Sequence, residues 1–336
     1  MVTNLRETFA FVRDVGLSGL DVEAGRLLFR DDRRWLFNRD LDGARFSFDR
    51  NPWHAEASLT TLAFGGRKVV LFPAFAGTPE KTVAKDEETT NLIASVTRDL
   101  PGRGELSAFL VDRKDRGIED ASPTLAGLQA RIEPIEDLKG WVDFAFETGR
   151  GAGRDALGQI HHERIQGYGL DLGATWVLPF RLQPSITAGF AVGSGGDRDP
   201  SDGNSNFRQT GLEDNSGRWN GVTTFRLYGE LFDPELSNLS IATLGFGLRP
   251  GKRTSLDLVG HRYTQPSPAA FLRESALRAI PDGVHGDLGW EADAVLGWRE
   301  VRNLDVEVVL ARLDPGGAFA GERAATFFKF EVRFKF

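Results

Sequence analysis

Charged side chains alternate with apolar ones along many short segments of this sequence, a spacing suited to binding an ion or a polymer. Guanidinium and ammonium groups can contact carboxylates without any covalent step, and arginine does so through a fixed two-pronged fork. Eight basic residues fall on the polar side of such segments: Arg26, Arg45, Arg131, Arg226, Arg249, Lys329, Arg333 and Lys335. The face of Arg26 can be assigned either way from its apolar neighbours, and a β-bulge at Gly25 would reconcile the two assignments.

Acidic residues share the same polar faces. They are Glu105, Asp143, Glu230, Asp257, Glu291, Asp293, Glu307 and Glu331. One interpretation is that acids and bases pair with each other along a solvated wall. The other is that the basic residues gather at a constriction and select anions. Both interpretations stay open at the level of sequence.

Motifs for other chemistry are weak. Adjacent His161 and His162 on a strand would point to opposite faces, so they do not converge on a metal. The oxygen-rich stretch 197–204 resembles a calcium loop, but Arg208 stands where a bidentate glutamate is needed, so an acidic loop is the preferred interpretation. The glycine-rich run 149–153 is not followed by a crossover helix, and no serine elbow or paired-carboxylate signature is found. The sequence therefore predicts no enzyme, no cofactor and no metal site, and the mixed charges do not indicate nucleic-acid binding.

The segments that carry these charges have the period of β-strands. At the C-terminus, five apolar residues alternate with four charged ones from Phe328 to Phe336. Similar alternation runs through 168–176, 186–192, 244–248, 288–298 and 304–310. The edge of a soluble sandwich could alternate in this way, but so many bulky apolar residues opposite so many charges fit a strand with lipid on one face and water on the other better. Trp290 and Trp298 are placed for the two aromatic girdles of a membrane barrel.

Composition agrees with this class. The chain has 336 residues, no cysteine and a formal net charge of −7. No apolar run approaches the roughly 20 residues of a transmembrane helix, whereas a barrel strand needs only about 9–11 alternating residues. We predict one domain over 1–336, an all-β, antiparallel up-and-down transmembrane barrel of about 16 strands in the bacterial outer membrane. Because the N-terminal residues do not form a signal peptide, we expect a mature form or an upstream start.

Turns and loops fit a barrel except in one place. Tight turns are predicted at 16–19, 51–52, 101–102, 250–251 and 301–302, and longer loops near 64–88, 151–161, 195–217, 264–286 and 314–325. Counting back from the C-terminus, the long segment 195–217 falls on the short-turn side. Either a strand hides near 206–212 or one of the spans predicted next to it is false.

The C-terminal half resembles the alginate export family of outer-membrane barrels. The likeness is most specific over 207–212, 228–230 and 234–239, and it extends to 193–197, 261–263, 287–291 and 315–319. The pairs Gly25-Arg26 and the run 42–45 resemble an earlier part of the family pattern more loosely. The family implies about 18 strands and an arginine-rich constriction that passes an acidic polysaccharide outward. Relative to it, this chain begins several strands late, and 299–303 is too short for the family's long periplasmic loop before the penultimate strand.

The resulting hypothesis is a pore for an anionic exopolysaccharide, alginate or a similar polyuronate, lined by the eight basic residues above. A general or small-anion porin and a structural or adhesion barrel are the alternatives. Expected partners are the polysaccharide, outer-membrane lipid, periplasmic export proteins and, through the terminal aromatic Phe336, the barrel assembly machinery.

Overall fold

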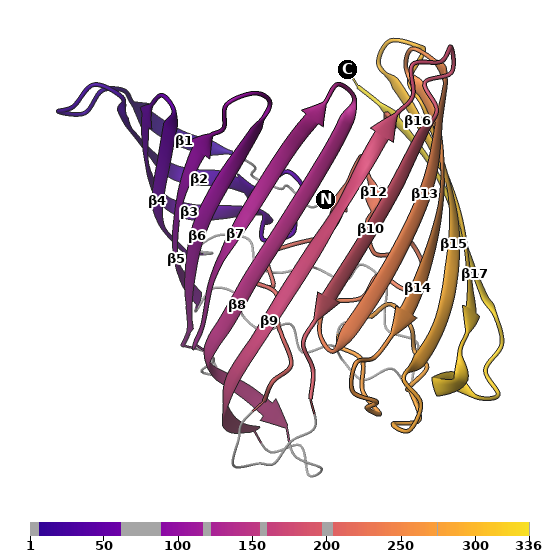
Figure 1. Ribbon diagram of the computed structural model, residues 1–336. Helices are drawn as coiled ribbons and strands as arrows, with labels where there is room; N and C mark the ends of the chain where they lie inside the picture. The colour runs from indigo at the N-terminus through magenta and orange to yellow at the C-terminus, as the bar shows by residue number, and fades with distance from the viewer. Residues whose placement is uncertain are drawn as a thin grey trace.

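A single curled antiparallel sheet forms the wall of the molecule (Figure 1). The computed structural model describes residues 7–61, 89–116, 122–154, 160–196, 204–273 and 275–335. Within them, 15 strands follow one another in chain order around the wall. They are β1 (Thr8–Val12), β2 (Leu20–Arg30), β3 (Asn38–Arg50), β4 (Trp53–Thr61), β5 (Thr89–Asp99), β6 (Gly104–Asp115), β7 (Ser122–Ile135), β8 (Leu138–Arg154), β9 (Ile160–Val177), β10 (Ser185–Gly193), β13 (Leu239–Gly251), β14 (Thr254–Thr264), β15 (Asp287–Trp298), β16 (Leu304–Pro315) and β17 (Ala325–Phe334). The up-and-down antiparallel class predicted from the alternation is confirmed.

The two ends of the wall differ in their connections. At one end, which we call the short-turn end, strands are joined by 13–19, 51–52, 100–103, 136–137, 178–184, 252–253 and 299–303. At the other, the long-loop end, the described connections include 31–37, 265–286 and 316–324. Figure 1 shows the short turns at the top, beside the C-terminus, and the longer connections at the bottom.

The difficulty at 195–217 is explained by the pairing of β10 directly with β13. Residues between these strands leave the wall at the long-loop end, so the false span is the one that placed Arg226 on a wall strand. The described residues between these strands contain only β11 (Ser216–Gly217) and β12 (Phe225–Arg226), which pair with each other in a separate two-stranded ribbon. No strand hides at 206–212. Parity is thereby restored, with 15 strands in the described wall rather than about 16.

The wall has an apolar outer face and a polar inner face. On β17, for example, Phe328, Phe330 and Phe334 are exposed on one side, while Lys329 and Arg333 lie on the other. Exposed aromatic side chains stand near both ends of the outer face, Trp53 and Trp176 at the short-turn end and Tyr168 and Trp290 at the long-loop end. This is the girdle pattern of barrels that sit in lipid. In the described residues, no helix has the length and apolarity to cross a membrane.

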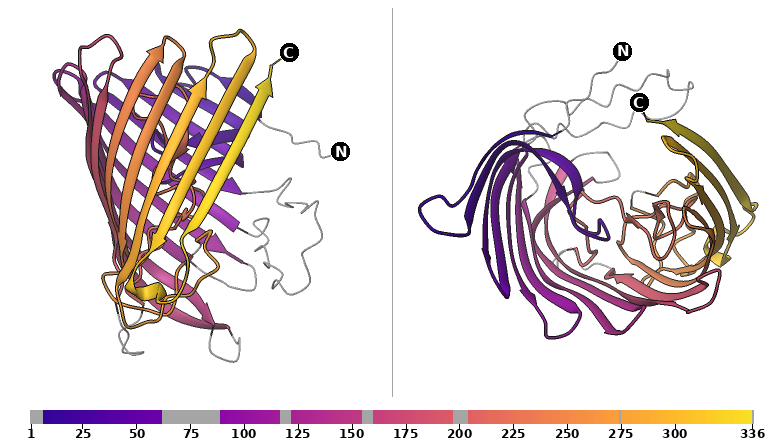
Figure 2. Two further views of the ribbon diagram at one scale, coloured as in Figure 1. Left: turned by 90° about the vertical axis from the view of Figure 1, so that its right-hand side faces the viewer. Right: turned by 90° about the horizontal axis from the view of Figure 1, so that it is seen from above.

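The lumen contains a folded segment rather than open solvent alone. Residues 204–238, which we call the inner insert, run inside the curled wall (Figure 2). Phe207, Phe232 and Leu236 of the inner insert are completely buried. They belong to one core with Trp35 and its neighbours in the connection 31–37 and with inner-face residues of the wall. The 3₁₀ turn η2 (Gly317–Phe319) adds two buried residues at the long-loop end.

Candidate functional site: the lumen

The connection 31–37 carries an arginine across the lumen to the opposite wall. Arg33 donates to Asp171 at 2.7 Å and lies 3.4 Å from Asp143, with its guanidinium 4.1 Å above the Trp141 ring. Burial lowers the pKa of Arg33, but Asp171 and then Asp143 more than reverse this and raise it. The loop keeps its shape because the Asp31 carboxylate accepts three backbone N–H groups, those of residues 35–37, at 2.8–2.9 Å. These contacts fix the loop on β8 and β9.

The inner insert is anchored on carboxylates of the wall. Glu291 on β15 accepts the backbone N–H groups of Leu231 at 2.7 Å and Phe232 at 2.9 Å. On β16, Glu307 accepts the hydroxyl of Thr223 at 2.6 Å. Two fixed N–H donors satisfy the charge of a buried carboxylate, which would otherwise be costly to desolvate. The insert therefore supplies the hydrogen-bond donors that stabilise Glu291 and Glu307 in their buried positions.

The same arrangement recurs on β8 and β9. Glu147 accepts the backbone N–H of Arg208 at 2.7 Å. Glu163 accepts the Arg208 guanidinium at 2.9 Å and the Asn204 amide at 2.6 Å. Tyr228 donates its hydroxyl to Asp171 at 2.9 Å, and burial, followed by the charge of Asp171, raises the pKa of Tyr228 well above its usual value.

Wall glycines admit the aromatic side chains of the insert. A Cβ atom added at Gly169 would lie 2.3 Å from the Phe207 ring, and one added at Gly245 would lie 2.3 Å from the Trp219 ring. Contacts this close exclude any larger residue unless the ring moves. The wall thus has both glycines that make room for the side chains of the insert and carboxylates that accept its hydrogen bonds.

Three of the predicted basic residues come together on the inner face of β17. Lys329 lies 2.6 Å from Glu307, Lys335 lies 2.7 Å from Asp305, and Arg333 pairs with Glu331. The exposed fractions of the three basic side chains are 36%, 63% and 49%, whereas Glu307 and Asp305 are exposed by only 9% and 11%. Glu307 and Asp305 are thus covered, whereas Glu331 is exposed by 34% beside the cations. We call Lys329, Arg333 and Lys335 the β17 cations.

The other predicted residues are spread around the lumen. Arg45 lies 3.3 Å from both Glu23 and Glu56, and Arg131 donates to Asp143 at 2.7 Å. Arg249 donates to a backbone carbonyl near the short-turn end. Arg226 is part of the inner ribbon rather than the wall and pairs with Asp233. The structure does not bring these four to one constriction.

Arg26 lies on the other side of the wall. The register from β2 to β3 runs without a shift from Leu20 to Arg30, so there is no bulge at Gly25 to change its face. Arg26 is opposite Asp42, at 3.2 Å, and shares the parity of the exposed outer-face residue Phe46. Its placement on the lumen face is therefore wrong, because Leu27 and Phe29, not Arg26, follow the inward phase.

A pocket that the sequence did not predict lies between the connection 31–37 and the inner insert. It measures about 430 Å³ and is lined by Arg30, Asp31, Asp32, Arg34, Gly217, Arg218 and Thr224. Among the residues that the structure describes, neither Arg30 nor Arg218 is paired with a carboxylate. Arg34 lies 3.5 Å from Asp214 and donates to Ser216. Arg34 and Arg218 sit in connections, where alternation along a strand gives no signal, and Arg30 is the last residue of β2. We call this the arginine pocket.

The described ranges include only some of the residues that were considered as metal ligands from sequence. Over the described ranges, no three His, Asp or Glu side chains are placed to hold a metal ion. Most of the acidic stretch 197–204 falls outside those ranges, as does the terminal Phe336. The side chains of His161 and His162 are likewise not described.

Comparison with known proteins places this geometry in a family. The alginate export family matches residues 3–329. The alginate production protein AlgE of Pseudomonas aeruginosa is 32% identical over 133 residues, which are 39% of this chain and 26% of that protein. AlgE of Azotobacter vinelandii is 28% identical over 140 residues, 39% of this chain and 28% of that protein. Each match thus spans little more than a quarter of the relative.

Solved structures share the fold. OccK3 (OpdO) of Pseudomonas aeruginosa aligns over 97% of this chain and 78% of its own, with a TM-score of 0.55 and 14% identity. OprD from the same organism, an outer-membrane protein, aligns over 95% and 75%, with a TM-score of 0.51 and 12% identity. The long-loop end of such barrels is extracellular and the short-turn end periplasmic. The match to the alginate export family over residues 3–329 agrees with the antiparallel wall and its aromatic girdles. The chain belongs to the alginate export family of bacterial outer-membrane β-barrels.

Proposed function

We propose that the chain is an outer-membrane pore that passes an anionic polysaccharide, alginate or a similar polyuronate, through a lumen whose accessible charges are basic. The observation that carries this proposal is the arginine pocket, a cavity of about 430 Å³. Its lining includes Arg30 and Arg218, which have no carboxylate partner in the described part of the chain, together with Asp31 and Asp32. Guanidinium groups recognise carboxylates through paired N–H donors.

The distribution of charge in the lumen supports the same proposal. Wall acids would oppose an anionic polymer if they were exposed. Instead, Glu147, Glu291 and Glu307 are buried against the inner insert. The β17 cations remain accessible near the periplasmic end, where a polymer leaving the periplasm would enter.

Weak contacts suit transport of a polymer. Exposed ion pairs contribute only about 0–1 kcal/mol each. A chain held at several such sites can slide from one to the next, whereas a few strong sites would stall it. Thr223 lies beside the β17 cations and its neighbour Thr224 lines the arginine pocket. The inner ribbon thus borders both basic regions.

Current block by an oligomer tests the proposal. Single channels in a planar bilayer would be titrated with oligomannuronate from the periplasmic side. We expect the wild type to be blocked and the double variant Arg30→Gln/Arg218→Gln to need about tenfold more oligomer, the loss expected for a charge-assisted hydrogen bond. Arg103→Gln, at the exposed turn after β5, serves as a matched control. Equal block of all three proteins would contradict a role for the pocket.

A porin for small anions is the second candidate, because the inner insert occupies lumen that an open polymer channel would leave free. It predicts anion-selective current that oligomannuronate does not alter. A closed structural barrel predicts no current at all.

A further inference from the structure

A groove on the outer face of the wall has the features of a lipid site. It crosses β10 and β13 to β17, measures about 700 Å³ and is lined mostly by outward apolar side chains. Its floor is made of small residues, Gly260, Ala292 and Ala294, which lie in register on β14 and β15. Its sides are larger, with Leu244 and Phe246 at one side and Leu310 at the other. An unbranched hydrocarbon chain fits a groove of this shape.

Basic and aromatic residues stand at the extracellular end of this groove. Register places Arg262 opposite Trp290 and Arg312 opposite Ala292. The two arginine side chains are 49% and 59% exposed. Arg262 donates to Asp287 at 2.8 Å, and Arg312 donates to Asp314 at 3.1 Å through two nitrogens. A guanidinium carries five N–H donors, so each keeps donors for another acceptor.

An arginine facing lipid costs about 2–4 kcal/mol at the bilayer midplane and nearly nothing at the interface. Arg262 and Arg312 must therefore lie at headgroup level, and Trp290 beside them has the side chain that favours that depth. The long-loop end faces outward, so the headgroups at this level belong to the outer leaflet.

We infer that this groove binds one acyl chain of an outer-leaflet lipid whose phosphate is held by Arg262 and Arg312. Among outer-membrane lipids, a phosphorylated, multiply acylated glycolipid, the lipid A part of lipopolysaccharide, has this chemistry. The site is independent of the pore, because it lies on the opposite face of the wall.

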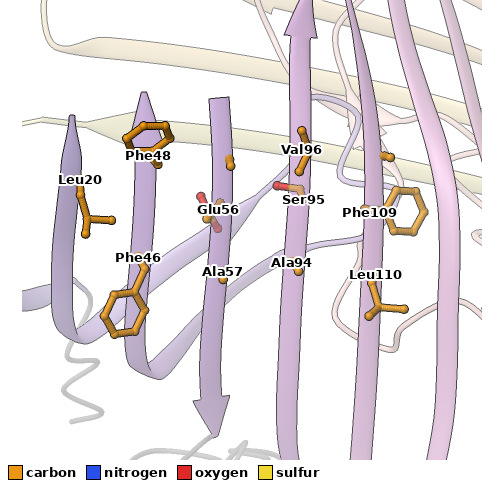
Figure 3. A pocket seen from close by; sticks show the side chains of 12 residues that line it. Leu20, Phe46, Phe48, Glu56, Ala57, Ala94, Ser95, Val96, Phe109 and Leu110 are labelled. Atoms are coloured by element: carbon orange, nitrogen blue, oxygen red, sulfur yellow. The ribbon is translucent and has the colours of Figure 1, made fainter. Parts of the chain in front are cut away.

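A second outer-face groove provides the contrast. It measures about 500 Å³ and lies on β2 to β6, where small residues such as Ala57 and Ala94 lie between Phe46 and Leu110 (Figure 3). None of its lining residues is basic. The nearest outer-face arginine, Arg98, stacks on Trp53 at the periplasmic end of the wall. Arg98 therefore offers a matched arginine in the wrong leaflet.

Native mass spectrometry of the purified barrel with diphosphorylated lipid A tests the inference. We expect a lipid A adduct on the wild type and on Arg98→Gln, and at least about tenfold weaker binding for Arg262→Gln/Arg312→Gln. Ala294→Phe, which fills the groove without altering charge, should weaken binding as well. Heat-dependent gel migration would verify that each variant is folded.

Lipid A without its phosphates distinguishes the contribution of the acyl-chain groove from that of the two arginines. We expect it to bind the wild type about as weakly as lipid A binds the double arginine variant. Equal binding of lipid A by the wild type, the double variant and Ala294→Phe would overturn the inference, as would equal loss in Arg98→Gln.

Discussion

At the residue scale, the wall carboxylates act as acceptors for the inner insert rather than as free lumen charges. Glu291 shows this most clearly, because it is fully buried and receives two consecutive backbone N–H groups. The sequence placed Glu291 on the inner face correctly. It could not show the partner, because Leu231 and Phe232 are 60 residues away and donate through their backbone, which leaves no trace in side-chain type.

Removing the Glu291 carboxylate should release the insert locally. In Glu291→Ala, the N–H groups of Leu231 and Phe232 lose their acceptor, at about 1–3 kcal/mol for each buried unsatisfied donor. We expect faster hydrogen exchange across 226–236 and larger current noise. Glu105→Ala, on the inner face of β6, is the control. Unchanged exchange in Glu291→Ala would show that the anchor is not needed.

The stability of the inner insert should depend on pH through the protonation of Glu213. Burial, and then the charge of Glu235, raise the pKa of Glu213 from 4.5 to about 7. The folded state thus holds this proton more tightly than the unfolded state. Its stabilising contribution is complete below the ordinary pKa and is lost as pH rises through about 7.

We therefore expect the insert to be more protected from hydrogen exchange at about pH 5 than at about pH 8, after correction for intrinsic rates. Glu213→Gln should remove most of this difference, because the amide does not titrate. A variant with the wild-type pH dependence would assign the effect to another group.

At the element scale, the inner insert decides what the lumen presents. Its residues were partly misassigned from sequence, since Phe225 and Leu227 alternate with polar residues as a wall strand would. Alternation reports one buried face and one polar face, and it does not say whether the polar face belongs to a barrel wall or to a ribbon inside it. The strands of the wall were predictable because each is bounded by a turn and repeats one pattern.

Replacing residues 206–237 by a short glycine–serine linker should change both the conductance of the pore and its ion selectivity. Because β10 pairs directly with β13, we expect the barrel still to assemble. We expect higher conductance and a shift toward cation selectivity, because Glu147 and Glu291 would become exposed. Higher conductance with unchanged anion preference would mean that the wall acids do not determine the ion selectivity of the pore.

At the scale of the whole molecule, the proposed function requires a pore whose accessible charge is opposite in sign to the total charge of the chain. The chain carries a formal −7, yet Glu147, Glu291 and Glu307 are buried while the side chains of the β17 cations are exposed by 36–63%. Sequence predicted the barrel, its outer face and six of the eight basic residues on the inner face of the wall. The arginine pocket could not be predicted because the end of β2 and the connection after it meet the inner insert, which is distant in sequence.

The most direct test of this account is the reversal potential of the wild-type pore in a planar bilayer under a potassium chloride gradient. We predict a potential of the sign given by anion selectivity, and a smaller one when the β17 cations are changed together to glutamine. A cation-selective wild-type pore would contradict the account, because it would mean that the wall acids, and not the basic groups, face the permeating ions.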